Sequence, residues 1–269
     1  MKKIRIGNAS GFWGDSSEAM IQQVQHGKLD YLVLDYLAEL AMSILQKQQN
    51  KNPTLGYVTD FINHFLPVAS FIKEKKVKIL TNAGGNNPFA CGQALQLACE
   101  KLGISLKIVV VEGDRIVDDV KNLYPEKANF SNFETAESFE NILPKLQSAN
   151  VYIGTPALVK ALEMGADVVI AGRATDSSLA IAPMVHEFSW KWNQWDLLAS
   201  GMIAGHVIEC GAQATGGNFT DWGKITDWGN YGYPLIEISE NGEFLVTKPQ
   251  NTGGIVSIHT VQELSLIHI

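Results

Sequence analysis

The chain alternates short apolar runs with stretches of helical periodicity, and most runs end in a polar, glycine-containing turn. The runs are rich in Val, Ile and Leu without polar alternation, which is typical of strands buried on both faces. Strands are predicted at residues 4–8, 31–35, 77–82, 106–111, 151–154 and 168–171. Helices are predicted at residues 16–26, 37–48, 58–74, 88–102 and 156–164. This order predicts an α/β fold, with a mostly parallel sheet covered by helices on both faces.

The pattern changes after Trp190. A helix is expected at 196–209, then a long Gly/Asp/Trp-rich loop at 211–230, and a β-hairpin at 235–248 that turns at Asn241-Gly242. We therefore expect an α/β sheet domain over 1–189 and a smaller C-terminal layer or subdomain over 190–264. The polar stretch 114–150 is interpreted as an insertion or an edge region. Residues 265–269 have no stop signal, which is consistent with a non-native tail and with a fragment.

Composition narrows the function classes. The chain is 46% hydrophobic and 18% charged, and its net charge of −7 with scattered Lys and Arg argues against nucleic-acid binding. Three cysteines form no CxxC pair, which fits a reducing compartment. No signal peptide and no run near the ~18 apolar residues of a membrane span is found. A cytoplasmic protein that does not bind membranes is expected.

Polar residues collect where the predicted strands end, and ligands of parallel α/β sheets bind beyond those ends. Glycines there let backbone N–H groups approach a ligand, and a helix N-terminus favours negative charge. Ordinary βα turns need the same residue types, so each turn alone keeps two interpretations. Several such turns at one sheet end favour a single crevice. The candidate ligand-binding residues of these turns are Asn8, Ser10, Gly11, Trp13, Asp15, Asn82, Gly84, Gly85, Asn86 and Arg173.

Two of these turns also carry candidate catalytic carboxylates, Asp35 and Asp176. Arg173 could hold a carboxylate or a phosphate through two parallel hydrogen bonds, with Asp176 orienting it or acting as a base. The alternative is a structural Arg–Asp pair with a helix cap.

The segment 205–218 is the densest polar patch. On a helix His206 faces Glu209 at i+3 and Cys210 at i+4, offering a base, an acid and a nucleophile. A reactive Cys210 needs a lowered pKa, and the alternative is a small buried hydrophobe. The segment is predicted to close over the crevice and to bring Glu209 and the turn at Gly216 near Asp176. Its candidate ligand-binding residues are Thr215, Gly216, Gly217 and Asn218.

No cofactor motif is identified. The segment Gly7–Gly11 lacks the GxGxxG spacing of a dinucleotide site, and no GxxxxGK[ST] sequence is present. The His206–Glu209 spacing is too weak to assign a metal.

Six stretches in order resemble the acyclic terpene utilisation AtuA family: GNASGFWGD at 7–15, LDYLVLDYLAEL at 29–40, TNAGGNNP at 81–88, GADVVIAGRATD at 165–176, HVIECGAQATGGNFTDW at 206–222 and NTGGIVS at 251–257. The resemblance spans almost the whole chain and departs after Glu263. It implies a role in degrading acyclic terpenes such as citronellol and geraniol, a route that runs on CoA thioesters. It assigns no catalytic residue.

The leading hypothesis is an enzyme for a branched acyl-CoA or a related hydroxy acid, acting in a hydration, lyase or carbon–carbon step. Asp35, Asp176 and Glu209 would supply acid/base chemistry, and a CoA thioester would be the small-molecule substrate. The rival is a non-catalytic subunit or binding protein of a biotin-dependent acyl-CoA carboxylase; a homo-oligomer also stays open. A closed crevice with converging carboxylates favours the enzyme, whereas a broad apolar face favours the subunit.

Overall fold

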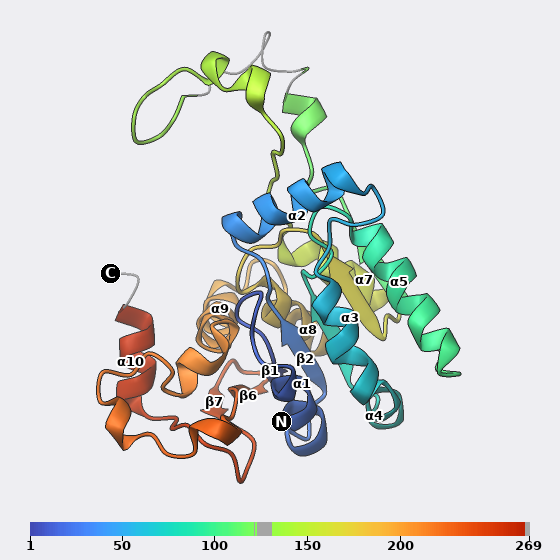
Figure 1. Ribbon diagram of the computed structural model, residues 1–269. Coiled ribbons are helices and arrows are strands. Elements are labelled where there is room, and N and C mark those ends of the chain that lie inside the picture. The colour runs from blue at the N-terminus through green and yellow to red at the C-terminus, as the bar shows by residue number, and fades with distance from the viewer. Residues whose placement is uncertain (121, 123–130, 267–269) are drawn as a thin grey trace.

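The computed structural model describes residues 1–120, 122 and 131–266, and a seven-stranded sheet runs through it in the order β4-β5-β3-β2-β1-β6-β7 (Figure 1). The first five strands are parallel where they pair. The last two are antiparallel, and β6 pairs with β1. The strands are β1 Lys3–Asn8, β2 Tyr31–Leu34, β3 Lys78–Thr81, β4 Ile108–Val111, β5 Val168–Ala171, β6 Leu235–Ser239 and β7 Phe244–Thr247.

Helices cover both faces of this sheet, as the sequence predicts. Alternate residues of one strand enter different cores: Leu32 packs on one face and Val33 on the other. The first face carries α1 Ser17–His26, α2 Glu39–Lys51, α3 Thr59–Phe65, α4 Ala69–Lys75 and α5 Pro88–Lys101. The second carries α7 Thr155–Glu163, α8 Ser178–Phe188 and α9 Trp195–Glu209. The α/β class is therefore confirmed.

Local chemistry explains several helix boundaries. The Asn87 side chain accepts a hydrogen bond from Ala90 N, and Pro88 follows in the first turn of α5, as predicted. The predicted helix at 58–74 is interrupted by the 3-10 turn η1 Leu66–Val68. Pro67 lies in this turn, and its missing N–H removes a helical hydrogen bond, so α3 and α4 are separate.

Two predicted features differ from the structure. Residues 151–154 do not join the sheet; Ile153 forms only an isolated bridge to Ala174. The hairpin forms with its turn at Gly242, where φ is +87°, but it extends the main sheet instead of building a layer of its own. The pairing of Ile4 with Ile238 sets this register. Free backbone groups on the open edge of β1 explain why the hairpin docks there.

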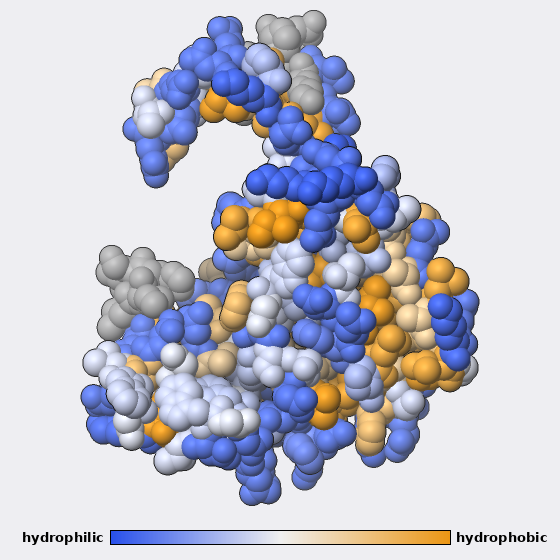
Figure 2. Space-filling view, in the orientation of Figure 1, coloured by the Kyte–Doolittle hydropathy of each residue, from blue (hydrophilic) through white to orange (hydrophobic). Residues whose placement is uncertain are grey.

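The predicted insertion is an arm that leaves the sheet after β4 and stands out from the body (Figure 1). Its base is closed by hydrogen bonds from Ile116 N to Ala149 O (2.8 Å) and from Val151 N to Asp114 O (2.7 Å). It contains η2 Phe139–Asn141 and η3 Leu143–Lys145. The face of the arm seen in Figure 2 is mainly hydrophilic. Residues 121 and 123–130 of this prediction, and 267–269 of the predicted tail, lie outside the described residues.

The C-terminal region lies beside α9. It comprises η4 Gly211–Thr215, η5 Trp222–Lys224, η6 Trp228–Asn230 and α10 Ile258–Leu266. Over the residues that the structure describes, no helix is long and apolar enough to cross a bilayer.

Candidate functional site

Asp35 lies just beyond β2 and is buried, with 9% of its surface exposed. Its Oδ1 accepts hydrogen bonds from Asn82 Nδ2 (2.5 Å), beyond β3, and from Leu37 N (3.2 Å). Burial raises the pKa of Asp35 to about 6, although both hydrogen bonds and the charge of Arg173 act against the rise. Asp35 is thus a carboxyl group that titrates close to neutral pH.

The turn after β1 joins Asp35 to the end of α9. Asp35 N donates to Ser10 O (2.9 Å), and Asn8 Nδ2 donates to Ser10 O (3.0 Å) and to Glu209 O (3.5 Å). A Cβ on Gly11 would lie 2.8 Å from Glu209 O, so only glycine allows this approach. Asn8, Ser10 and Gly11 thus contact the backbone beside Asp35 and Glu209, and ligand binding by them stays a prediction.

Glu209 lies at the last residue of α9, and its side chain is 12% exposed. Its Oε1 lies 2.9 Å from His206 Nδ1, so the predicted i,i+3 pair forms. Burial raises the pKa of Glu209 to about 8, and the charges of Asp176 and Asp35 add to the rise. At neutral pH Glu209 therefore retains its proton. Ser177 and Arg173 act in the opposite direction.

Arg173 lies beyond β5, and only 7% of its side chain is exposed. Its Nη1 donates to Ala174 O (3.0 Å) and lies 3.4 Å from Asp176 Oδ1, while the guanidinium stacks 4.3 Å from the centre of the Tyr152 ring. Tyr152 in turn donates to Glu39 Oε1 (2.6 Å). These contacts correspond to the structural Arg–Asp pair of the sequence analysis. Binding of an anionic ligand by Arg173 stays a prediction.

The turn after β3 is used for packing. Gly84 N donates to Ala171 O (3.1 Å), and a Cβ there would lie 2.5 Å from that oxygen. Gly85, at φ +54°, faces Leu45, and Asn86 Nδ2 donates to Met42 O (3.0 Å). Of this predicted cluster, Asn82 contacts Asp35, whereas the Gly84 N–H and the Asn86 Nδ2 bind other parts of the protein.

The later residues of the turn after β1 also make their polar contacts within the protein. Asp15 accepts hydrogen bonds from Gly11 N (2.6 Å) and from Tyr233 OH (2.7 Å), and Trp13 Nε1 donates to Asp60 Oδ2 (2.7 Å). Both predicted residues hold the turn in shape through these contacts.

The segment after Glu209 departs from its prediction. Thr215 Oγ1 donates to Gly232 O (2.7 Å), and a Cβ on Gly216 (φ +104°) would lie 2.2 Å from Ile225. Asn218 Nδ2 donates to Gln213 Oε1 (2.8 Å), and Gly217 N donates to Ala212 O (2.9 Å). These contacts fold the segment against the loop at 225–232. Glu209 lies close enough to Asp176 for the charge of Asp176 to raise its pKa, and closure of the segment over the crevice stays a prediction.

Cys210 follows Glu209 and packs against Val207, Ala214 and Leu264. Burial raises the pKa of its thiol to about 12, and the neighbouring carboxylates add to the rise. A nucleophilic thiolate requires the opposite shift. The environment therefore favours the small hydrophobe. Among the described residues, no group of three or more His, Cys, Asp or Glu is arranged to hold a metal ion.

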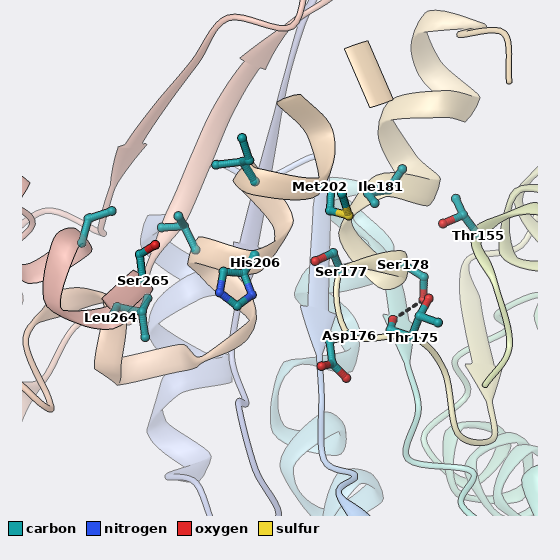
Figure 3. Close-up of a pocket in the computed structure, with 13 residues that line it drawn as sticks. Thr155, Thr175, Asp176, Ser177, Ser178, Ile181, Met202, His206, Leu264 and Ser265 are labelled. Carbon is teal, nitrogen blue, oxygen red and sulfur yellow. Dashed lines mark hydrogen bonds between the residues drawn. The ribbon is translucent and has the colours of Figure 1, made fainter. Parts of the chain in front are cut away.

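A pocket of about 720 Å³ opens beside Asp176 and His206, between α8, α9 and α10 (Figure 3). Its apolar wall was missed by the sequence reasoning. The available clue was α9, whose sequence is apolar on most sides, as expected of a helix that faces a core and a ligand at once. The residues lining the pocket are Thr155, Thr175, Asp176, Ser177, Ser178, Ile181, Met202, Ile203, His206, Val207, Val261, Leu264 and Ser265.

Comparison with known proteins gives one match. Residues 4–266 match the model of a family described as "Acyclic terpene utilisation family protein AtuA". The match extends through almost the whole chain. No curated protein and no solved structure matches.

Proposed function

The chain belongs to the acyclic terpene utilisation AtuA family, and we propose that it is an enzyme that performs acid/base chemistry on a small molecule of that metabolism. The observation that carries this proposal is a pair of buried carboxyl groups whose pKa values differ. Glu209, with its pKa raised to about 8, is protonated at neutral pH, and Asp35, with its pKa raised to about 6, is ionised. Such a pair supplies an acid and a base at once.

Hydration of a double bond, its reversal, or a related lyase step fits these groups best. In the dehydrating direction Asp35 takes a proton from carbon while Glu209 donates its proton to the departing hydroxyl oxygen. A carbon–carbon double bond forms and water leaves, so the atoms balance. His206 orients the Glu209 carboxyl group, and Asn82 with Arg173 keeps Asp35 ionised near neutral pH.

The proposed substrate is a branched acyl thioester or a related hydroxy compound, whose chain occupies the pocket beside Asp176. The apolar wall of this pocket, the Asp176 carboxylate in its lining and the contact of the lining residue His206 with Glu209 support an enzyme over the rival interpretation, a non-catalytic subunit of a carboxylase.

Solvent exchange tests the proposal without knowledge of the whole reaction. Branched acyl-CoA thioesters and the corresponding alcohols are incubated with the protein in D₂O, and deuterium uptake is measured by mass spectrometry. The wild-type protein and Glu240→Gln, which alters an exposed carboxyl group, should exchange at least one substrate. Glu209→Gln should not. Full exchange by Glu209→Gln would remove this residue from the chemistry.

A further inference from the structure

The pocket beside Asp176 has a polar end and an apolar end. In Figure 3 His206 and Asp176 lie below Met202 and Ile181, with Ser177 between the two levels, so the two apolar side chains lie together away from the Asp176 carboxyl group. Ile203 and Val207 of α9, together with Val261 and Leu264 of α10, extend the apolar wall. Its volume of about 720 Å³ lies within the ~300–1,000 Å³ typical of small-molecule sites. The size and the lining thus suit a small molecule with an apolar chain and a polar group.

The charges around the polar end determine which polar group can bind. None of the residues that line this pocket in the described chain is Lys or Arg, and Asp176 is among them. Arg173, the cation next to Asp176, is 7% exposed and already contacts Ala174 O, Asp176 and the Tyr152 ring. Asp176 is 62% exposed and paired with Arg173, so the apolar walls and the absence of Lys and Arg from the described lining are what disfavour a ligand anion: its charge would lose water without gaining a cationic partner.

We infer that the pocket binds a molecule with an uncharged oxygen group, a hydroxyl or a carbonyl, on an apolar chain, and that it discriminates against a free carboxylate. The oxygen group lies at the Asp176–His206 end, next to Glu209, and the chain lies along Ile181, Met202 and Ile203. This inference rests on the proposed function only in placing the oxygen group within reach of Glu209. A carboxylate in the same position would face Asp176.

The test compares 1-octanol with octanoate, two probes of equal chain length, by isothermal titration calorimetry with the full-length protein at pH 7. Octanol should bind at least on the order of tenfold more tightly than octanoate, because the apolar walls displace water from a carboxylate and no Lys or Arg in the described lining pairs with it. Equal or tighter binding of octanoate, or no binding of octanol, overturns the inference.

Variants locate the binding. Ile203→Trp should abolish octanol binding by filling the apolar wall, whereas Leu102→Trp, an exposed position at the end of α5, should leave it unchanged. Asp176→Asn should strengthen octanoate binding by no more than about fivefold, because Asp176 is largely exposed and paired with Arg173, and should leave octanol binding within about twofold of wild type. Retained octanol binding in Ile203→Trp places the probe elsewhere and overturns the assignment. Glu209→Gln should still bind octanol, so loss of exchange and loss of binding are separate results.

Discussion

Glu209 Oε1 lies 2.9 Å from His206 Nδ1, one turn earlier on α9. The contact fixes one oxygen of the Glu209 carboxyl group, whose pKa is raised by burial and by the charges of Asp176 and Asp35. The helix approaches closely enough because Gly205 packs against Ser177, where a Cβ would lie 3.1 Å from the Ser177 carbonyl oxygen. The position and the raised pKa of Glu209 therefore depend on the packing of α9 as well as on the residue type.

The raised pKa of Glu209 gives a stability prediction with a definite sign. Its pKa rises from 4.5 to about 8 on folding, so the folded protein holds this proton more tightly than the unfolded chain does. This contribution is complete below pH 4.5 and is lost as the pH rises to about 8. Glu209→Gln has no such loss. Its stability relative to wild type should increase by about 3 kcal/mol or more across this window, at ~1.4 kcal/mol per pKa unit.

Urea unfolding at pH 5 and pH 9 measures this difference, and Glu240→Gln, at an exposed position, serves as the control with a constant difference. If the difference in free energy of unfolding between Glu209→Gln and wild type is the same at pH 5 and pH 9, ionisation of Glu209 does not destabilise the folded protein. The assignment of Glu209 as the acid would then fail.

The sequence predicts the elements that local pattern determines. The strand at 168–171 is found as predicted, because four consecutive apolar residues in a βαβ context leave little alternative. The strand predicted at 151–154 is absent, because Tyr152 makes long-range contacts instead. Its ring covers Arg173, and its hydroxyl group donates a hydrogen bond to Glu39. A β-rich local sequence cannot reveal such a distant partner.

The site was predicted in part for the same reason. Asp35, Asp176, His206 and Glu209 were identified because titratable residues stand out at strand and helix ends. The pocket wall was not, because α10 reaches it from far along the chain and α9 alone does not show which apolar side faces a cavity. The glycine-rich turns at 84–86 and 216–218 attracted a ligand interpretation, although their backbone groups bind the protein itself.

Gly172 is predicted to be a position where a methyl group is not tolerated. A Cβ there would lie 2.3 Å from Asp114 Oδ1, and this buried carboxylate already accepts hydrogen bonds from Arg173 N (3.0 Å) and Asn150 Nδ2 (2.9 Å). Gly172→Ala should lower the free energy of unfolding by about 2–3 kcal/mol through overpacking. Gly223→Ala, where nothing lies within 4 Å of the added carbon, should change it by less than about 0.5 kcal/mol. If Gly172→Ala and Gly223→Ala change thermal unfolding equally, Asp114 must move to make room for the methyl group without loss of stability.

Cys210→Ala should affect stability more than chemistry. Its thiol packs among apolar side chains, and burial holds its pKa at about 12, so removing the sulfur should cost about 1 kcal/mol of stability. The rate of solvent exchange should stay within about threefold of wild type, since no step is assigned to the thiol. Loss of exchange with unchanged urea unfolding would instead make Cys210 the nucleophile.

Arg173 should set the pH range in which the enzyme works. Turnover requires ionised Asp35 and protonated Glu209, so the exchange rate should follow a bell between apparent pKa values of about 6 and about 8 that belong to the coupled pair. The guanidinium lowers the pKa of both carboxyl groups. Arg173→Gln should therefore move both the acidic and the basic side of this pH profile to higher pH.

The control is Arg115→Gln, which breaks an ion pair of the arm with Asp118 and should leave both sides of the profile in place. A shift of one side alone would show that Arg173 acts on a single carboxyl group, and an unchanged bell would mean that other residues carry the protons.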